Sequence, residues 1–445
     1  MPIYGYGASV ALFVFLAFNG SGAIRTTGKI SCDDNRCDDI FPVFILPICR
    51  LRLRKYINRK VAHTMNEAKL YADNFGAAFF EENGFLHFLR ERTDSGWWRR
   101  EESRDLHFLA LDDESDESGD YINECMDNGT EDIMKDTMEN TRLLLQAQDQ
   151  CYPVRTCAIK SILERAKISG TALNKVEKPV LARILNYCMG VATGSALLRY
   201  SEGKISAVHG GDSSEYAILE MSELFEAMAD YLNATYPGCQ FAGASYDHSI
   251  ATAVWEICQD SLIETYKEAL EAHGIPYDTL KPALRLTSSD VGISGANIYP
   301  MLLSGKDEKI ITLGSPLKLE HKTGANLEKF KSQLPMIYAQ YTLAIGNLMN
   351  LLKIEINNPV NCFLGVCKKI GVTKKLAYDA ATLFEGQNGN TPCTAHEIYY
   401  GISEVIFMMQ CAGESGSRIA QMEENIARAF TVRWHDYDIP GEAKW

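Results

Sequence analysis

Residues 196–208, with the sequence ALLRYSEGKISAV, contain the pattern that decides the fold of this chain. Two short runs, Ala196–Tyr200 and Ile205–Val208, consist mainly of apolar residues that suit strands. The residues between them include Gly203, which can adopt the positive φ that a tight turn between two strands requires. The arrangement predicts a β-hairpin, and therefore a chain that is not built from helices alone.

Further strand-like segments surround this hairpin, and two helical segments lie among them. Extended chain is expected in residues 216–219, 240–257, 283–287, 296–303 and 309–313. Helical periodicity predicts helices near residues 222–236 and 260–273. Because Pro300 has no amide hydrogen, the segment that contains it is expected at a sheet edge or as an irregular strand. Residues 191–320 are thus predicted to form the β-rich centre of the molecule.

The segments on both sides of this centre have helical patterns. Residues 65–111 and 131–190 are expected to be mainly helical. The C-terminal third is predicted to be helical throughout, and Thr394 and Glu397 have the spacing of a capping box before residues 398–411. The fold class predicted is therefore α+β, with a helical N-terminal lead-in, a central β-rich region with interleaved helices, and a helical C-terminal third.

The charge of the chain is unevenly distributed. The 445 residues have a net charge of −14, which excludes proteins that coat nucleic acid through general positive charge. Residues 1–64 hold nine Lys and Arg against four Asp and Glu, so they carry +5 and the remainder carries −19. Two apolar runs, residues 8–18 and 40–49, are shorter than the roughly 20 residues that span a bilayer.

These differences suggest a division of the chain. Residues 1–64 are expected to lie upstream of a true start at Met65, with a weak membrane or signal segment as the alternative. No firm membrane association is predicted. The regions expected are the extension 1–64, a helical lead-in 65–130 with an acidic linker at 112–120, an α+β core 131–325, and a helical region 326–445 packed on that core.

The cysteines and the familiar enzyme motifs limit the function further. The 13 cysteines form no C-x-x-C pair, which favours reduced thiols and a cytoplasmic protein. The sequence contains no P-loop, no G-x-G-x-x-G fingerprint, no G-x-S-x-G elbow and no H-E-x-x-H motif. It therefore does not predict the nucleotide-binding and hydrolytic enzymes that these motifs mark.

Histidines and acidic residues at the ends of the central segments are the candidates for chemistry. Imidazole and carboxylate groups transfer protons and bind metals near neutral pH. The candidate catalytic residues are His209, Asp212, Asp247, His248, Asp290, Glu320 and His321. The candidate ligands of a divalent metal are His209, His248, Asp290 and His321. In the alternative interpretation, Asp247 and Asp290 form local turn hydrogen bonds and the nearby glycines serve turns.

Five phrases in the chain resemble one family. They are YPVRTCAIKSILERAKISG (152–170), KISAVHGGDSSEYAILEMSELF (204–225), ALRLTSSDVGISGANIYPMLL (283–303), LGSPLKLEHKTGA (313–325) and CTAHEIYYGISEVIFM (393–408). Over residues 140–445 the chain resembles an uncharacterised group related to the phage- and plasmid-like proteins of domain of unknown function family 932. The resemblance implies a cytoplasmic accessory protein of bacterial phages, plasmids or conjugative elements. It implies no reaction and no catalytic residue.

Three functions are compatible with these observations. The first is a binding or accessory role in nucleic-acid processing on a mobile element, with nucleic acid or other element proteins as partners. The second is a metal-dependent enzyme that acts on a nucleotide or nucleic acid. The third is a self-assembling structural protein, for which the sequence offers an apolar helical surface at residues 398–409.

Overall fold

The computed structural model describes residues 69–113, 119–123, 130–305, 309–441 and 445. The predicted extension 1–64 lies outside the described residues, as does most of the predicted acidic linker 112–120. Within the described part of the chain, no helix has the length and apolar character needed to cross a membrane.

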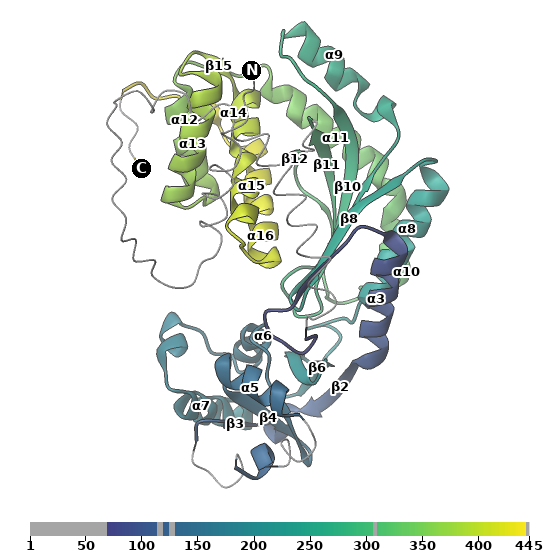
Figure 1. Ribbon diagram of the computed structural model, residues 1–445, viewed down its shortest axis with the longest axis vertical. Helices are drawn as coiled ribbons and strands as arrows, with labels where there is room; N and C mark the ends of the chain where they lie inside the picture. The colour runs from purple at the N-terminus through teal and green to yellow at the C-terminus, as the bar shows by residue number, and fades with distance from the viewer. Residues whose placement is uncertain (1–68, 114–118, 124–129, 306–308, 442–444) are drawn as a thin grey trace, which may run out of the picture. The chain divides into compact units, whose positions relative to one another are not determined.

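Seven strands form the largest sheet, in the order β1-β8-β9-β10-β11-β12, with β13 also paired to β11 (Figure 1). Every neighbouring pair is antiparallel. The strands are β1 (Gly76–Phe79), β8 (Gln240–Asp247), β9 (Ile250–Glu256), β10 (Leu280–Ser288), β11 (Ala296–Ser304), β12 (Lys309–Thr312) and β13 (Leu317–Leu319).

Two three-stranded sheets complete the β structure of the described core. Their orders are β2-β6-β7 and β3-β4-β5. The strands are β2 (Trp97–Glu102), β3 (His107–Ala110), β4 (Leu143–Ala147), β5 (Gln150–Pro153), β6 (Ser195–Ser201) and β7 (Lys204–Gly210). A short antiparallel pair, β14 (Glu355–Ile356) and β15 (Cys393–Thr394), joins segments of the C-terminal third.

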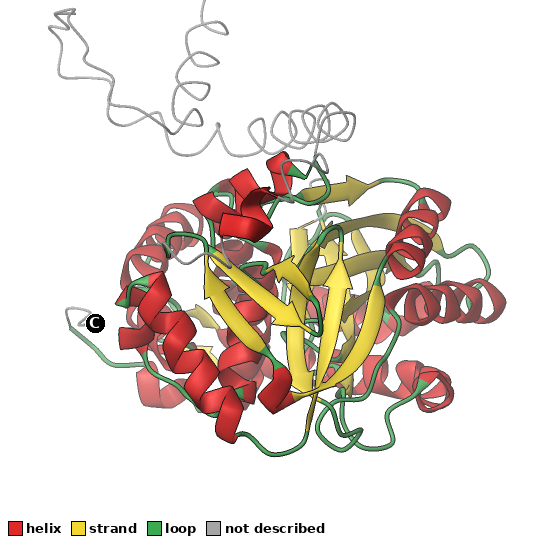
Figure 2. Ribbon diagram, turned by 90° about the horizontal axis from the view of Figure 1, so that it is seen from below, coloured by secondary structure: helices red, strands yellow, loops and turns green. Residues whose placement is uncertain are grey.

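The α-helices lie on both sides of the large sheet and beside the smaller ones (Figure 2). Those before residue 300 are α3 (Glu82–Ser95), α5 (Glu131–Glu139), α6 (Ala158–Arg165), α7 (Lys178–Val191), α8 (Met221–Thr235) and α9 (Glu264–Ala272). The later helices are α10 (Leu327–Gln333), α11 (Ile337–Leu351), α12 (Pro359–Ile370), α13 (Lys374–Asn388), α14 (Ala395–Ile402), α15 (Glu404–Cys411) and α16 (Gly416–Ala427). The α+β class and the helical C-terminal third are therefore confirmed.

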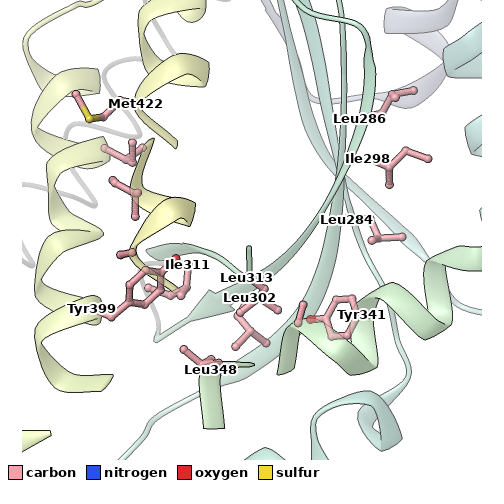
Figure 3. Close-up of a cluster of buried hydrophobic side chains, with 14 of the residues drawn as sticks. Leu284, Leu286, Ile298, Leu302, Ile311, Leu313, Tyr341, Leu348, Tyr399 and Met422 are labelled. Carbon is pink, nitrogen blue, oxygen red and sulfur yellow. The ribbon is translucent and has the colours of Figure 1, made fainter. Parts of the chain in front are cut away.

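Helices cover both faces of the central strands β10 and β11. Leu284, Leu286 and Ile298 belong to a large apolar core that also contains Tyr341 of α11 (Figure 3). On the opposite face, Arg285 and Tyr299 are paired across the two strands, and both contact acidic residues of α16. Double coverage explains why these strands are buried along nearly their whole length.

The predicted hairpin is confirmed. β6 and β7 pair antiparallel, and the turn residues Glu202 and Gly203 have φ values of 51° and 80°. Two successive positive φ values are the geometry of a type I′ turn, whose twist matches that of the flanking strands.

Pro300 predicts a sheet edge or an irregular strand; the edge is wrong, whereas the pairing on the outer side of its strand is interrupted at this residue. Pro300 lies in β11, which pairs with β10 on one side and with both β12 and β13 on the other. β13 covers Ala296–Ile298 and β12 covers Met301–Ser304, so Pro300 falls in the gap between them. An interior strand accommodates the missing amide because no neighbour requires it at this position.

The helical character predicted for residues 65–111 and 131–190 is wrong in part. The first range contains β1, β2 and β3, and the second contains β4 and β5. The three leucines at 143–145 are all fully buried, so β4 shows no alternation of apolar and polar residues. The strand predicted at residues 216–219 is also wrong, because that segment has no strand pairing.

Candidate functional site

A polar cavity of about 440 Å³ lies where the smaller β2-β6-β7 sheet meets segments that leave the large sheet. We name it the imidazole cavity. The residues that define it are His209, Tyr216, Gly292, Lys318, Glu320 and His321. His209 lies near the end of β7, Gly292 follows β10, and His321 follows β13. Three of the seven candidate residues predicted from sequence, His209, Glu320 and His321, therefore line one cavity.

Three rings are stacked in the wall of this cavity. The ring of Tyr216 lies 3.7 Å from that of His209 and 4.9 Å from that of His321, measured between centroids. The interplanar angles are 4° and 8°, so the three rings are nearly parallel. Each ring is at least nine-tenths buried. The stack fixes both imidazoles relative to each other although they are 112 residues apart in the chain.

Hydrogen bonds to backbone carbonyls determine the tautomer of each imidazole. His209 Nε2 lies 3.0 Å from the carbonyl oxygen of Asp290, and His321 Nδ1 lies 3.0 Å from that of Ala217. A carbonyl oxygen only accepts, so these two nitrogens are the protonated donors. His209 Nδ1 and His321 Nε2 are then the bare acceptor nitrogens, and His321 Nε2 has no partner among the described residues.

Burial keeps both imidazoles uncharged at neutral pH. Desolvation lowers the pKa of His209 to about 4, against a smaller opposing effect of its bond to Asp290. Desolvation also lowers the pKa of His321. Neutral imidazoles offer acceptor nitrogens to a ligand, which is the property of a binding group, whereas the lowered pKa values make both rings weak bases.

A buried ion pair between Arg199 and Asp290 lies next to the stacked rings. Arg199 Nε donates to Asp290 Oδ2 at 2.9 Å, and the two side chains are 4% and 11% exposed. The Arg199 guanidinium also lies over the ring of Trp98, at 5.2 Å from its centroid. Asp290 thus supports the site in two ways: its carboxylate pairs with Arg199 of β6, and its backbone carbonyl accepts from His209. These contacts differ from the local turn hydrogen bond predicted for Asp290 in the alternative interpretation.

Charged side chains of both signs line the cavity, and the acidic ones are Glu164, Glu215, Glu320 and Glu424. Lys167, Lys318 and Lys322 line it. Lys318 Nζ lies 3.6 Å from Glu424, and Lys322 Nζ lies 2.7 Å from Glu320. The side chains of Lys318 and Lys322 are 46% and 69% exposed, so their ion pairs are weak and open to competition from another anion.

The other candidate residues lie outside the imidazole cavity. Asp212 accepts the amide of Ser214 at 2.7 Å, and Asp247 accepts the amides of Ser249 and Ile250 at 2.7 and 3.0 Å. Both carboxylates therefore stabilise local turns, which the alternative interpretation predicts for Asp247 but not for Asp212.

His248 also has a structural position. It is 5% exposed, and its Nε2 lies 3.1 Å from the carbonyl oxygen of Ala72. Its ring packs against Phe75, and desolvation lowers its pKa well below the ordinary value. Among the described residues, no group of three or more His, Cys, Asp or Glu side chains is placed to hold a metal ion. The predicted divalent-metal site is therefore not formed by the four candidate ligands.

The apolar helical surface predicted at residues 398–409 is internal. Ile398, Ile402, Val405 and Met409 are all buried, and they belong to the main apolar core. This stripe is covered by the chain itself and offers no surface for self-assembly.

Sequence reasoning missed Tyr216 and Arg199. Tyr216 stands in an unremarkable segment, and only the tertiary fold brings its ring between two histidines. Arg199 does carry a signal, because a charged residue inside the apolar run ALLRY must find a buried partner. The sequence does not show that this partner is Asp290.

Comparisons with known proteins do not assign this chain to a family. No protein-family model matches the chain, and neither a curated protein nor a solved structure matches it. An inference about function therefore starts from the cavity and its side chains.

Proposed function

We propose that the protein has a binding or accessory role in nucleic-acid processing and that the imidazole cavity holds a nucleotide or the end of a nucleic-acid strand. The observation that carries the proposal is the pair of stacked, neutral imidazoles in a cavity that Lys318 and Lys322 also line. The resemblance to family 932 supports the context, a cytoplasmic protein of a bacterial mobile element.

The chemistry of a nucleotide fits this cavity in three ways. Its volume of about 440 Å³ lies within the roughly 300–1,000 Å³ of small-molecule sites. A nucleobase carries N–H donors for the bare Nδ1 of His209. A phosphate can approach Lys318 and Lys322, whose side chains are 46% and 69% exposed.

The net charge of the chain also favours binding at one local site over binding along a nucleic-acid backbone. A net charge of −14 opposes general attraction to a nucleic-acid backbone. A local cluster of lysines at one cavity can still bind a single phosphate, because salt limits the reach of distant charges to about 8–10 Å. The cavity would therefore bind a single nucleotide, and the protein would not bind along the backbone of a duplex.

Binding of nucleotides by the full chain tests the proposal. Deoxynucleoside monophosphates and a short single-stranded oligonucleotide are titrated by calorimetry against the wild type and against K318Q/K322Q. The matched control is K368Q/K369Q, which removes two exposed lysines from the end of α12.

We expect the cavity variant to bind at least about tenfold more weakly, because a hydrogen bond to a charged group contributes roughly 1.5–3 kcal/mol. The control variant should bind like the wild type. Absence of binding up to about 1 mM ligand, or an equal loss in both variants, would contradict the proposal.

A further inference from the structure

One of the four acidic residues that line the imidazole cavity differs from the others. Glu164, Glu320 and Glu424 each form an ion pair with a lysine, at 3.8, 2.7 and 3.6 Å. Within the part of the chain that the structure describes, no side chain or backbone group donates to the carboxylate of Glu215, and this residue is exposed. Glu215 is therefore the acid of the cavity whose two oxygens are available to a ligand.

A tight turn holds Glu215 at the wall of the cavity. The amides of Glu215 and Tyr216 both donate to the carbonyl oxygen of Asp212, at 2.9 and 3.0 Å. A Cβ added to Gly210 would overlap the side chain of Glu215, so this side chain lies against the backbone at the end of β7. Gly210 also lines the cavity and directly follows His209. The free carboxylate is thus fixed at the same strand end as the stacked rings.

The chemistry of a carboxylate distinguishes the four bases. A carboxylate has two oxygens side by side and only accepts hydrogen bonds. Guanine carries two adjacent donors on its pairing edge, N1–H and the 2-amino group, which can donate to both oxygens in parallel. Adenine and cytosine place an amino donor beside a ring-nitrogen acceptor, and thymine places one N–H between two carbonyl acceptors. A free carboxylate therefore favours guanine over the other three bases.

We propose that the imidazole cavity selects a guanine nucleotide, with N1–H and the 2-amino group of the base donating to the two oxygens of Glu215. This inference rests on the proposed function, because it names the nucleotide that the cavity binds. The bare Nδ1 of His209 is also an acceptor, so both of these groups favour a base that is rich in donors. Lys318 and Lys322 remain for the phosphate.

Calorimetric titration of the full chain with five deoxynucleoside monophosphates tests this inference. Four carry guanine, adenine, cytosine and thymine, and the fifth carries hypoxanthine, which is guanine without the 2-amino group. We expect the guanine nucleotide to bind at least about tenfold more tightly than each of the others, because each of them loses at least one hydrogen bond to the carboxylate. Equal affinities for all five, or a preference for another base, would overturn the guanine assignment and leave the proposed function standing. Absence of binding by all five would reject both.

A matched pair of variants assigns the preference to Glu215. E215Q keeps the size of the side chain but replaces one acceptor oxygen with a donor, so it should bind the guanine and hypoxanthine nucleotides alike. E268Q makes the same change at an exposed glutamate of α9 that does not line the cavity, and it should keep the preference of the wild type. An undiminished preference in E215Q, or an equal loss in E268Q, would overturn the role of Glu215. If E215Q does not fold, the comparison of the guanine and hypoxanthine nucleotides on the wild type decides.

Discussion

At His209, one hydrogen bond determines which ring nitrogen is available to a ligand. The carbonyl of Asp290 fixes the proton on Nε2 and leaves Nδ1 bare. Gly292 lies beside this ring with a φ of 79°, and a Cβ at that position would lie 3.1 Å from His209 Cε1. The glycine therefore permits both the turn and the close approach of the backbone to the ring.

The low pKa of His209 predicts how stability depends on pH. The folded protein takes up this proton only near pH 4, whereas the unfolded chain takes it up near pH 6.5. As pH falls from 6.5 to 4, protonation favours the unfolded chain, and up to about 3 kcal/mol of stability is lost.

Urea unfolding of the wild type and H209Q at several pH values between 7 and 4 measures this loss. Gln can still donate to the Asp290 carbonyl but does not titrate, so the variant should lose less stability over this range. His248, His321 and His396 also have lowered pKa values and remain in both proteins. Identical pH profiles for the two proteins would show that His209 is not a source of the loss.

The sequence indicates residue-level roles where the interactions are local. Asp247 accepts the amides of residues two and three positions later, so its turn bonding could be predicted from its neighbours alone. The contact between Tyr216 and His321 joins residues that are 105 positions apart. Such a contact depends on the fold of the intervening strands, and local patterns in the sequence do not predict it.

At the scale of elements, the start of α14 is fixed by its capping box. The Thr394 side chain accepts the amide of Glu397, and the Glu397 carboxylate accepts the amide of Thr394 at 2.7 Å. Both residues could be identified from the sequence because the motif spans only four positions.

We expect T394A to lower the free energy of unfolding by about 1 kcal/mol, since an otherwise unpaired helix amide loses its acceptor. The matched control is T373A, because Thr373 occupies the N-cap of α13 without a side-chain cap hydrogen bond. Chemical unfolding of both variants checks this. Similar losses in the two would argue against a contribution from the capping box.

The sequence predicts the elements whose apolar residues follow a clear pattern, and it does not predict the short buried strands. The run at residues 283–287 and the hairpin at 196–208 correspond to observed strands. The sequence does not identify β4 because its five residues are nearly all buried and resemble part of a helix in composition. β4 pairs with β3, which lies more than 30 residues earlier in the chain, and β5 in turn pairs with β4.

At the scale of the whole molecule, a buried ion network joins the large sheet to a smaller one. Lys204, at the start of β7, has a fully buried side chain, and its Nζ lies 2.9 Å from Asp73 and also contacts Asp136 of α5. Arg155 Nη1 lies 3.8 Å from Asp73 and donates to the carbonyl of Tyr71 at 3.0 Å. The segment that leads into β1 is thereby attached to the β6–β7 hairpin.

Removing the central cation should destabilise the protein strongly. K204M removes the one cation that contacts both Asp73 and Asp136, which leaves Asp73 with Arg155 and Thr156, and we expect a loss of about 3–5 kcal/mol. K135M, on α5, removes an exposed pair with Glu131 and should cost at most about 1 kcal/mol. Denaturant unfolding of the two variants gives the comparison, and a loss below about 1 kcal/mol for K204M would mean that the network does not contribute to stability.

The gap opposite Pro300 has a consequence for how this sheet can vary among related chains. The outer side of β11 is covered by two short strands that are separated by residues 313–316. Insertions or deletions after Leu313 would change the length of that connection without altering the register of β12 or β13. This edge can therefore tolerate changes in chain length, whereas the uninterrupted pairing of β10 with β11 cannot.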